Sequence, residues 1–224
     1  MQNCATEDEK KRTAELIRPI LRGRDIKRYG YEWADLWLIN THNGIKGKIP
    51  PIDINDYPAI KQHLDCYWDK ISKRDDKGVT PYNLRNCAYL DDFNQSKIIY
   101  PNMTKYMPFV FDSNQFVTNQ KCFIVTGTNL SFLTAFLNSS LFKYCFRDSF
   151  PELQGGTREL SKIFFDKIPV FLPNKEIEKR FSQLVNDIQA DYSIDKAKRI
   201  DEEIFAIYGL TAVEQKQIGY IEIT

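Results

Sequence analysis

The chain has 224 residues, of which 42% are hydrophobic and 27% are charged, a composition typical of an ordered globular protein with a sizeable core. Its 31 basic and 30 acidic residues give a net charge of +1, which excludes a protein that coats nucleic acid with its whole surface. The charge is uneven: residues 174–224 carry a net charge of −3, so residues 1–173 carry +4, and we expect any nucleic-acid contact in the earlier part.

No apolar run approaches the roughly 20 residues that a membrane helix needs, and the N-terminus is polar where a signal peptide would be apolar. We therefore expect a cytoplasmic protein with no membrane partner. The five cysteines are scattered and show no C-x-x-C spacing, and with only two histidines the sequence predicts free thiols and no metal site. A small hydrolase that pairs Cys122 or Cys145 with a histidine stays open as an alternative.

In chain order, Thr6 and Glu9 form a capping-box pattern that predicts a helix over residues 1–16, ending near Pro19. The following segment, residues 18–29, contains five basic residues and a single acid, Asp25. One interpretation is a solvated loop in which Asp25 pairs with a neighbouring arginine. The other is a segment that contacts phosphates through Arg22, Arg24, Lys27 and Arg28.

Apolar and aromatic patterning predicts strands over residues 31–39, 97–101, 109–111 and 122–125, and a helix that follows Pro58. Before the last strand stands Thr118-Asn119-Gln120-Lys121, a cluster of amides and a cation. Asn119, Gln120 and Lys121 are candidates for reading base edges, although a polar strand end has the same composition.

Residues 131–146 carry an aromatic stripe that predicts a core-packing helix. The loop Gln154-Gly155-Gly156-Thr157-Arg158 follows, in which two adjacent glycines let a partner approach the backbone closely. The Gln154 amide suits an adenine edge, and the Arg158 guanidinium suits guanine or a phosphate. An ordinary surface loop is the alternative interpretation.

A strand is predicted over residues 168–172, and Pro173-Asn174 marks a boundary. Beyond it, apolar periodicity predicts amphipathic helices over residues 177–188 and 194–208, and Thr211-x-x-Glu214 begins a short final helix. The two amphipathic helices need a surface to cover, which is one another, the sheet or another domain.

Several segments, in this order, resemble the TaqI-like C-terminal specificity domain. This is the target recognition domain of Type IIG restriction-modification enzymes and related adenine-N6 DNA methyltransferases. The most specific segment is Arg22-Gly23-Arg24-Asp25-Ile26. The other similar stretches are Trp37–Ile39, Ile54–Ile60, Tyr82–Arg85, Lys97–Pro101, Leu133–Ser139, Gly155-Gly156 and Lys167–Pro173. The later stretches also look like the recognition domains of Type I specificity subunits, and Ile200–Thr211 is similar to the C-terminal ends of these enzymes.

The resemblance implies an α+β fold in which a mixed β-sheet target recognition domain with packed helices, residues 1–173, precedes a C-terminal helical extension, residues 174–224. It also implies sequence-specific recognition of double-stranded DNA. The DNA backbone would be held by Arg22, Arg24, Lys27 and Arg28. The bases in the DNA groove would be read by Gln154, Thr157 and Arg158, and Gly155 and Gly156 would give access to that groove. A module that docks a partner protein through aromatic surfaces remains the alternative.

The sequence departs from the family's enzymes where their catalytic motifs stand. The Asn/Asp-Pro-Pro-Tyr/Phe motif that holds a flipped adenine is absent, since Pro50-Pro51 lies between Ile49 and Ile52. There is also no glycine-bearing loop for S-adenosylmethionine and no nuclease-like Asp…Glu-x-Lys cluster. We therefore expect a non-catalytic chain that binds no cofactor itself and works with a methyltransferase or endonuclease domain of the same parent protein, where S-adenosylmethionine would bind.

Overall fold

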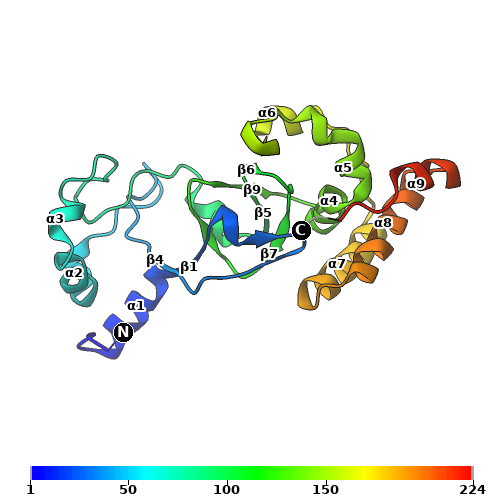
Figure 1. Ribbon diagram of the computed structural model, residues 1–224. Coiled ribbons are helices and arrows are strands. Elements are labelled where there is room, and N and C mark those ends of the chain that lie inside the picture. The colour runs from blue at the N-terminus through cyan, green and yellow to red at the C-terminus, as the bar shows by residue number, and fades with distance from the viewer. Residues whose placement is uncertain (1, 223–224) are drawn as a thin grey trace. The chain divides into compact units, whose positions relative to one another are not determined.

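The computed structural model describes residues 2–222, which form an α+β fold of two compact units (Figure 1). The first unit comprises residues 2–20, 35–94 and 115–117, and the second comprises residues 21–34, 95–114 and 118–222. The predicted α+β class is confirmed. No helix within residues 2–222 is long and apolar enough to cross a membrane.

The first unit contains three helices and short strands around a small apolar cluster. Its elements are α1 (Glu7–Leu16), β1 (Ile17–Leu21), β4 (Trp37–Ile39), η2 (Ile54–Asp56), α2 (Pro58–Asp65), α3 (Trp68–Ile71) and η3 (Leu90–Asn94). Strand β1 pairs antiparallel with β4, and Leu16, Ile54 and Ile60 form the buried cluster.

Glu9 ties α1 to α2 in this unit. Its carboxylate accepts the N–H of Ala5 at 2.8 Å and the N–H of Ala59, in the first turn of α2, at 2.9 Å. These two hydrogen bonds lower the pKa of Glu9 below its ordinary value, because they stabilise the charged form. Glu9 therefore does more than the capping pattern predicts, since it also satisfies a donor of a second helix.

A three-stranded antiparallel sheet lies at the centre of the second unit. Strand β5 (Lys97–Pro101) runs between β7 (Val110–Asp112) and β9 (Cys122–Thr126) and is buried along its whole length. The shorter strands of the chain are β2 (Ile26–Lys27), β3 (Gly30–Tyr31), β6 (Met103–Thr104), β8 (Val117–Thr118) and β10 (Arg158–Glu159).

Side-chain amides complete the outer edge of β7. Asn138 exchanges two hydrogen bonds with the backbone of Phe109, at 3.1 and 2.8 Å. Gln189 does the same with Phe111, at 2.9 Å in both directions. Each amide supplies one donor and one acceptor, as a neighbouring strand would, so the edge is satisfied without another strand.

Six helices belong to this unit, of which α4 (Leu130–Asn138) packs directly on β5 and β7 and the others extend the core beyond it (Figure 1). The others are α5 (Ser140–Phe146), α6 (Lys162–Phe165), α7 (Lys175–Ala190), α8 (Ile194–Ile207) and α9 (Ala212–Ile218). Helices α7 and α8 lie against each other and against α4, and Phe181, Val185, Ile200 and Ile204 join the same buried cluster as Phe109 and Phe136. The helices after residue 174 thus share the core of the sheet. The boundary placed at 173 stays a prediction.

Glu178 of α7 holds the N-terminus of α4. The residue before α4, Asn129, has a left-handed backbone and makes no side-chain cap. The two carboxylate oxygens of Glu178 instead accept the N–H groups of Ser131 and Phe132, each at 3.0 Å. A residue 47 positions away thus satisfies donors that a local cap usually satisfies, and its charge is favoured at this end of the helix.

Three predicted elements are wrong in detail. The strand expected over residues 31–39 is interrupted, since residues 32–36 form no strand between β3 and β4. The helix expected over residues 131–146 breaks at Ser139, whose hydroxyl accepts the N–H of Phe142 at 3.1 Å and starts α5. The strand expected over residues 168–172 is absent, because Pro169 has no N–H to donate and the N–H of Phe171 binds the hydroxyl of Tyr208 at 3.0 Å. The helices predicted at 177–188 and 194–208 and the final capping box are confirmed.

Candidate functional site

The basic segment after β1 folds into a tight turn, η1 (Gly23–Asp25), around one carboxylate. Arg22 donates to Asp25 from its guanidinium, at 2.7 and 2.9 Å, and from its backbone N–H at 2.9 Å. The hydrogen bond from the Arg22 guanidinium is the main reason that the pKa of Asp25 lies below its ordinary value, although Asp25 is buried. The pairing of Asp25 with a neighbouring arginine, one of the two interpretations of this segment, is therefore present.

Gly23 brings this turn against another part of the chain. A Cβ at position 23 would lie 3.1 Å from the carbonyl oxygen of Lys121 and 3.3 Å from the Cβ of Pro101. The same Lys121 carbonyl accepts the N–H of Asn102 at 2.9 Å. The missing side chain of Gly23 thus lets the basic turn and the polar turn at residues 119–122 touch.

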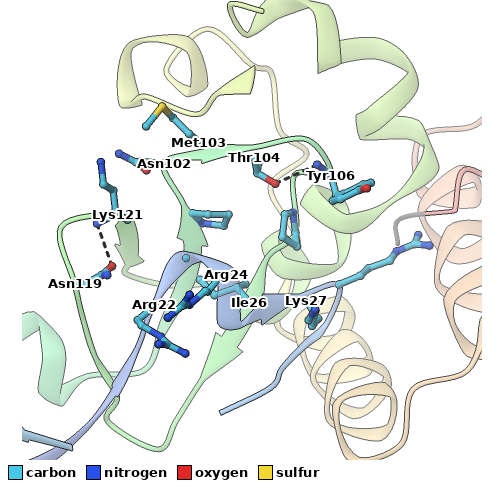
Figure 2. Close-up of a pocket in the computed structure, with 14 residues that line it drawn as sticks. Arg22, Arg24, Ile26, Lys27, Asn102, Met103, Thr104, Tyr106, Asn119 and Lys121 are labelled. Carbon is cyan, nitrogen blue, oxygen red and sulfur yellow. Dashed lines mark hydrogen bonds between the residues drawn. The ribbon is translucent and has the colours of Figure 1, made fainter. Parts of the chain in front are cut away.

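These two turns and the segment after β5 enclose a cavity of about 670 Å³ in the second unit (Figure 2). The residues around it come from three stretches of sequence: Arg22, Gly23, Arg24, Ile26, Lys27 and Arg28; Pro101, Asn102, Met103, Thr104, Tyr106 and Pro108; and Asn119 and Lys121. Figure 2 shows the cationic side chains of the first stretch on one side of the cavity and Asn102, Met103 and Thr104 on the other.

The cavity has a net positive lining. Arg24, Lys27 and Lys121 are exposed, and Lys27 reaches Glu32 at 3.3 Å in a pair whose side chains are both solvated. Within residues 2–222, no acid forms an ion pair with Arg24 or Lys121. Arg24 and Lys121 therefore face solvent outside the ion pairs of the described residues, although Asp25 adjoins Arg24 in the turn.

The amides of the 119–122 turn differ in their surroundings. The Asn119 side chain lines the cavity, and its oxygen accepts the N–H of Lys121 at 3.1 Å, which shapes the turn. Gln120 is exposed and does not line the cavity. Of the three candidates in this turn, the structure brings Asn119 and Lys121 together with the basic segment.

The double-glycine loop is closed by its arginine. Arg158 donates to the carbonyl of Phe150 at 3.0 Å and forms ion pairs with Asp148 at 2.9 Å and Glu152 at 2.8 Å, and it is only 8% exposed. Gly155 and Gly156 have φ angles of 74° and 76°, which favour glycine. The Arg158 guanidinium thus holds the loop, whereas the Gln154 side chain is exposed.

The loop and the cavity are connected through β6. Strand β10, which begins at Arg158, pairs antiparallel with β6, where Glu159 lies opposite Met103 and Arg158 opposite Thr104. Met103 and Thr104 line the cavity. The loop that carries Gln154 and Thr157 therefore leads directly into a strand that pairs with the cavity wall, in the same unit as Arg22 and Arg24.

Arg28 lies in the interior. Its guanidinium donates to the carbonyl of Asn138 at 2.8 Å and to the hydroxyl of Tyr220 at 2.8 Å, and lies 3.8 Å from the carboxylate of Asp201. The side chain is 2% exposed. Arg28 is among the residues around the cavity, but its guanidinium contacts helices α4 and α8. Its predicted phosphate contact stays a prediction.

Sequence reasoning did not identify the wall formed by Asn102, Met103, Thr104 and Tyr106. The available signal was the change from the apolar strand Lys97–Pro101 to a polar and basic stretch directly after the proline. Tyr106 and Met103 are both exposed, and the Thr104 hydroxyl accepts the N–H of Tyr106 at 3.1 Å. Apolar and hydrogen-bonding groups therefore stand side by side along this wall.

Nothing in the surroundings of the two candidate nucleophiles activates them. Burial raises the pKa of Cys122 to about 12, and burial also raises the pKa of Cys145. A thiol needs a lowered pKa to act as a nucleophile near neutral pH, and neither of these two thiols has one. Residues 2–222 contain no group of three or more side chains placed to hold a metal ion.

Comparison with known protein families matches residues 18–170 to the TaqI-like C-terminal specificity domain. The matched region begins within β1 and includes every stretch that lines the cavity as well as the double-glycine loop. A search of curated proteins found no match.

Substitution of Gly23 by alanine tests the close approach at the cavity. The neighbouring atoms are a hydrogen-bonded carbonyl and a proline, neither of which can rotate away, so we expect Gly23→Ala to lower the free energy of unfolding by about 1 kcal/mol. Gly30→Ala is the matched control, since a Cβ there meets nothing within 4 Å, and it should be neutral or slightly stabilising. Urea denaturation measures both, and equal stabilities would contradict the packing argument.

The ion pair of the η1 turn predicts a pH dependence. Because the folded-state pKa of Asp25 lies below that of the unfolded chain, about 3.9, its contribution to stability is complete above about pH 5 and is lost as the pH falls through the folded-state pKa. Wild type should exceed Asp25→Asn in unfolding free energy at about pH 6, and this difference should shrink below about pH 4. Thermal denaturation at several pH values measures it; a difference that is constant with pH would refute the assignment.

Proposed function

Since the chain belongs to the family of TaqI-like C-terminal specificity domains, which recognise DNA in restriction-modification systems, we propose that it reads a specific sequence of double-stranded DNA and leaves the chemistry to another domain. The observation that carries this proposal is the cavity lined by the exposed cations Arg24 and Lys121. Positive charge on a concave surface attracts the phosphate backbone and fixes the position of the protein on the duplex.

In this proposal the cations of the cavity hold phosphates. Arg24 and Lys121 are exposed and hold no ion-pair partner among the described residues, so they provide the main contacts. Lys27 adds a contact because its solvated pair with Glu32 is weak and can exchange for a phosphate. Arg22 adds a fixed charge that Asp25 partly neutralises.

Base reading is assigned to the exposed polar groups of the loops. The Gln154 amide can bond an adenine edge bidentately, and Gly155 and Gly156 leave open space for a groove wall to approach. Thr157 stands next to them, and Asn119 and Gln120 are secondary candidates. Arg158 and Arg28 act as positioning residues, since one closes the reading loop and the other anchors the basic segment on the helices.

Catalysis is assigned to a methyltransferase or endonuclease domain of the same parent protein, which would bind S-adenosylmethionine and act in the cytoplasm. Two observations support this assignment: Pro50-Pro51 lacks the polar and aromatic neighbours of an adenine-binding motif, and the thiols Cys122 and Cys145 are not activated.

Phosphate contacts should act on all sequences alike. We expect Arg24→Gln and Lys121→Gln each to weaken binding of every duplex and to reduce the slope of log K against log salt concentration by about 1. Lys179→Gln removes an exposed cation of α7 away from the cavity and should change nothing. Fluorescence titrations of labelled duplexes at several salt concentrations measure these effects. The absence of salt-dependent binding at about 100 μM protein and low ionic strength would refute the proposal and favour a protein-docking module.

Base reading should instead act on one position of the target. Once selection from a random duplex library has defined the preferred site, Gln154→Ala should lose about 1–3 kcal/mol of discrimination at one base pair and should bind unrelated duplexes as wild type does. Gln217→Ala, which changes a glutamine of α9 outside the proposed interface, is the control. A uniform loss of affinity for all duplexes would remove Gln154 from the reading residues.

A further inference from the structure

The first unit contains a hollow of its own, of about 530 Å³. It is lined by the loop of residues 43–51, except Gly44, and by Asn86. None of these residues lines the cavity of the second unit, and none is part of the proposed recognition site.

The backbone of this loop depends on a glycine. Gly44 has a φ of 70°, and a Cβ there would lie 2.2 Å from the carbonyl oxygen of Ile49, a distance that no side chain tolerates. The loop folds back through hydrogen bonds between Ile45 and Ile49, at 2.8 and 2.9 Å. Its tip is Lys46-Gly47-Lys48, where Gly47 has a φ of 76° and open space around it.

An amide fixes the base of the loop. The Asn43 side chain accepts the N–H of Val79 at 2.7 Å and donates to Asn86, which brings Asn86 to the rim of the hollow. A Cβ at Gly78 would lie 2.4 Å from the Asn43 side-chain oxygen, so Gly78 is required for this arrangement. The tip is therefore presented from a well-defined base.

The charge of the loop is entirely positive. Residues 43–51 contain two lysines and no acid. Lys46 is exposed and forms no ion pair with any acid in the part of the chain that the structure describes. Lys48 pairs with Asp91, but both side chains are solvated, at 66% and 38% exposure, so this pair contributes little and can exchange for another anion.

We propose that Lys46 and Lys48 of this loop bind the phosphodiester backbone of the same DNA duplex that the second unit reads. The two ammonium groups flank Gly47, which leaves the protein backbone of the loop accessible. Ammonium groups bind phosphate oxygens as point charges, independently of the DNA sequence. No aromatic side chain lines the hollow, so it offers no stacking surface for a base, which favours the backbone as the ligand. This inference rests on the proposed function and adds a second contact, in the other unit.

Lysine acetylation with and without DNA tests the contact directly. In wild type, saturating duplex DNA should protect Lys46 and Lys48 from acetylation, as measured by mass spectrometry, whereas Lys70, an exposed lysine of α3, should react equally in both states. Inorganic phosphate at the same ionic strength should protect neither lysine of the loop. Equal protection by inorganic phosphate would overturn the proposal, because the loop would then be a general anion site.

The salt dependence of DNA binding provides a second test of this contact. The double variant Lys46→Gln/Lys48→Gln should reduce the salt slope by about 2 for every duplex, without changing base preference, whereas Lys70→Gln should match wild type. An unchanged slope in the double variant, while Arg24→Gln still weakens binding, would overturn this inference and leave the proposed function intact. A wild-type chain without salt-dependent DNA binding would instead refute both.

Discussion

The close approach of Gly23 to the backbone of Lys121 determines where the charges of the second unit lie. These residues are nearly a hundred positions apart, and a Cβ at position 23 would lie 3.1 Å from the Lys121 carbonyl oxygen. On one side of this contact, Asp25 holds Arg22 and shapes the turn that exposes Arg24. On the other side, the Lys121 carbonyl fixes Asn102 and thereby the opposite wall of the cavity. Because residue 23 is a glycine, the basic turn and two polar segments can therefore lie around a single cavity.

Several charged and amide groups of the second unit stabilise the fold. Asn138 and Gln189 satisfy the edge of β7, Glu178 caps α4, and Arg158 closes the double-glycine loop. Arg28 joins the basic segment to the helices. These groups meet backbone atoms that would otherwise be buried without a partner, which is costly. Arg24 and Lys121 have no such role and face solvent, so a chain of net charge +1 still presents local positive surface at the cavity.

The sequence predicted the elements that depend on local physics. Apolar periodicity identified α7 and α8, and the Thr211–Glu214 pattern identified the start of α9. It could not predict which arginines face solvent, because that depends on distant partners: Asp201 lies 173 positions from Arg28 along the chain. The cavity wall at residues 102–106 was also not predictable, since it forms through the pairing of β6 with β10. Long-range pairing of this kind leaves no periodic signal in either segment.

The residues proposed to bind phosphates and the residue proposed to read bases differ in how firmly the fold holds them. Arg22 and the turn that carries Arg24 are held by a buried carboxylate and a close backbone contact, as suits groups that must fix the position of a duplex. Gln154 instead lies on a loop whose glycines have open space around them, and its side chain is exposed. Because Arg158 closes this loop from inside, residue 154 can change without disturbing the closure. Under the proposed function, base preference can therefore vary while the phosphate contacts and the core stay constant.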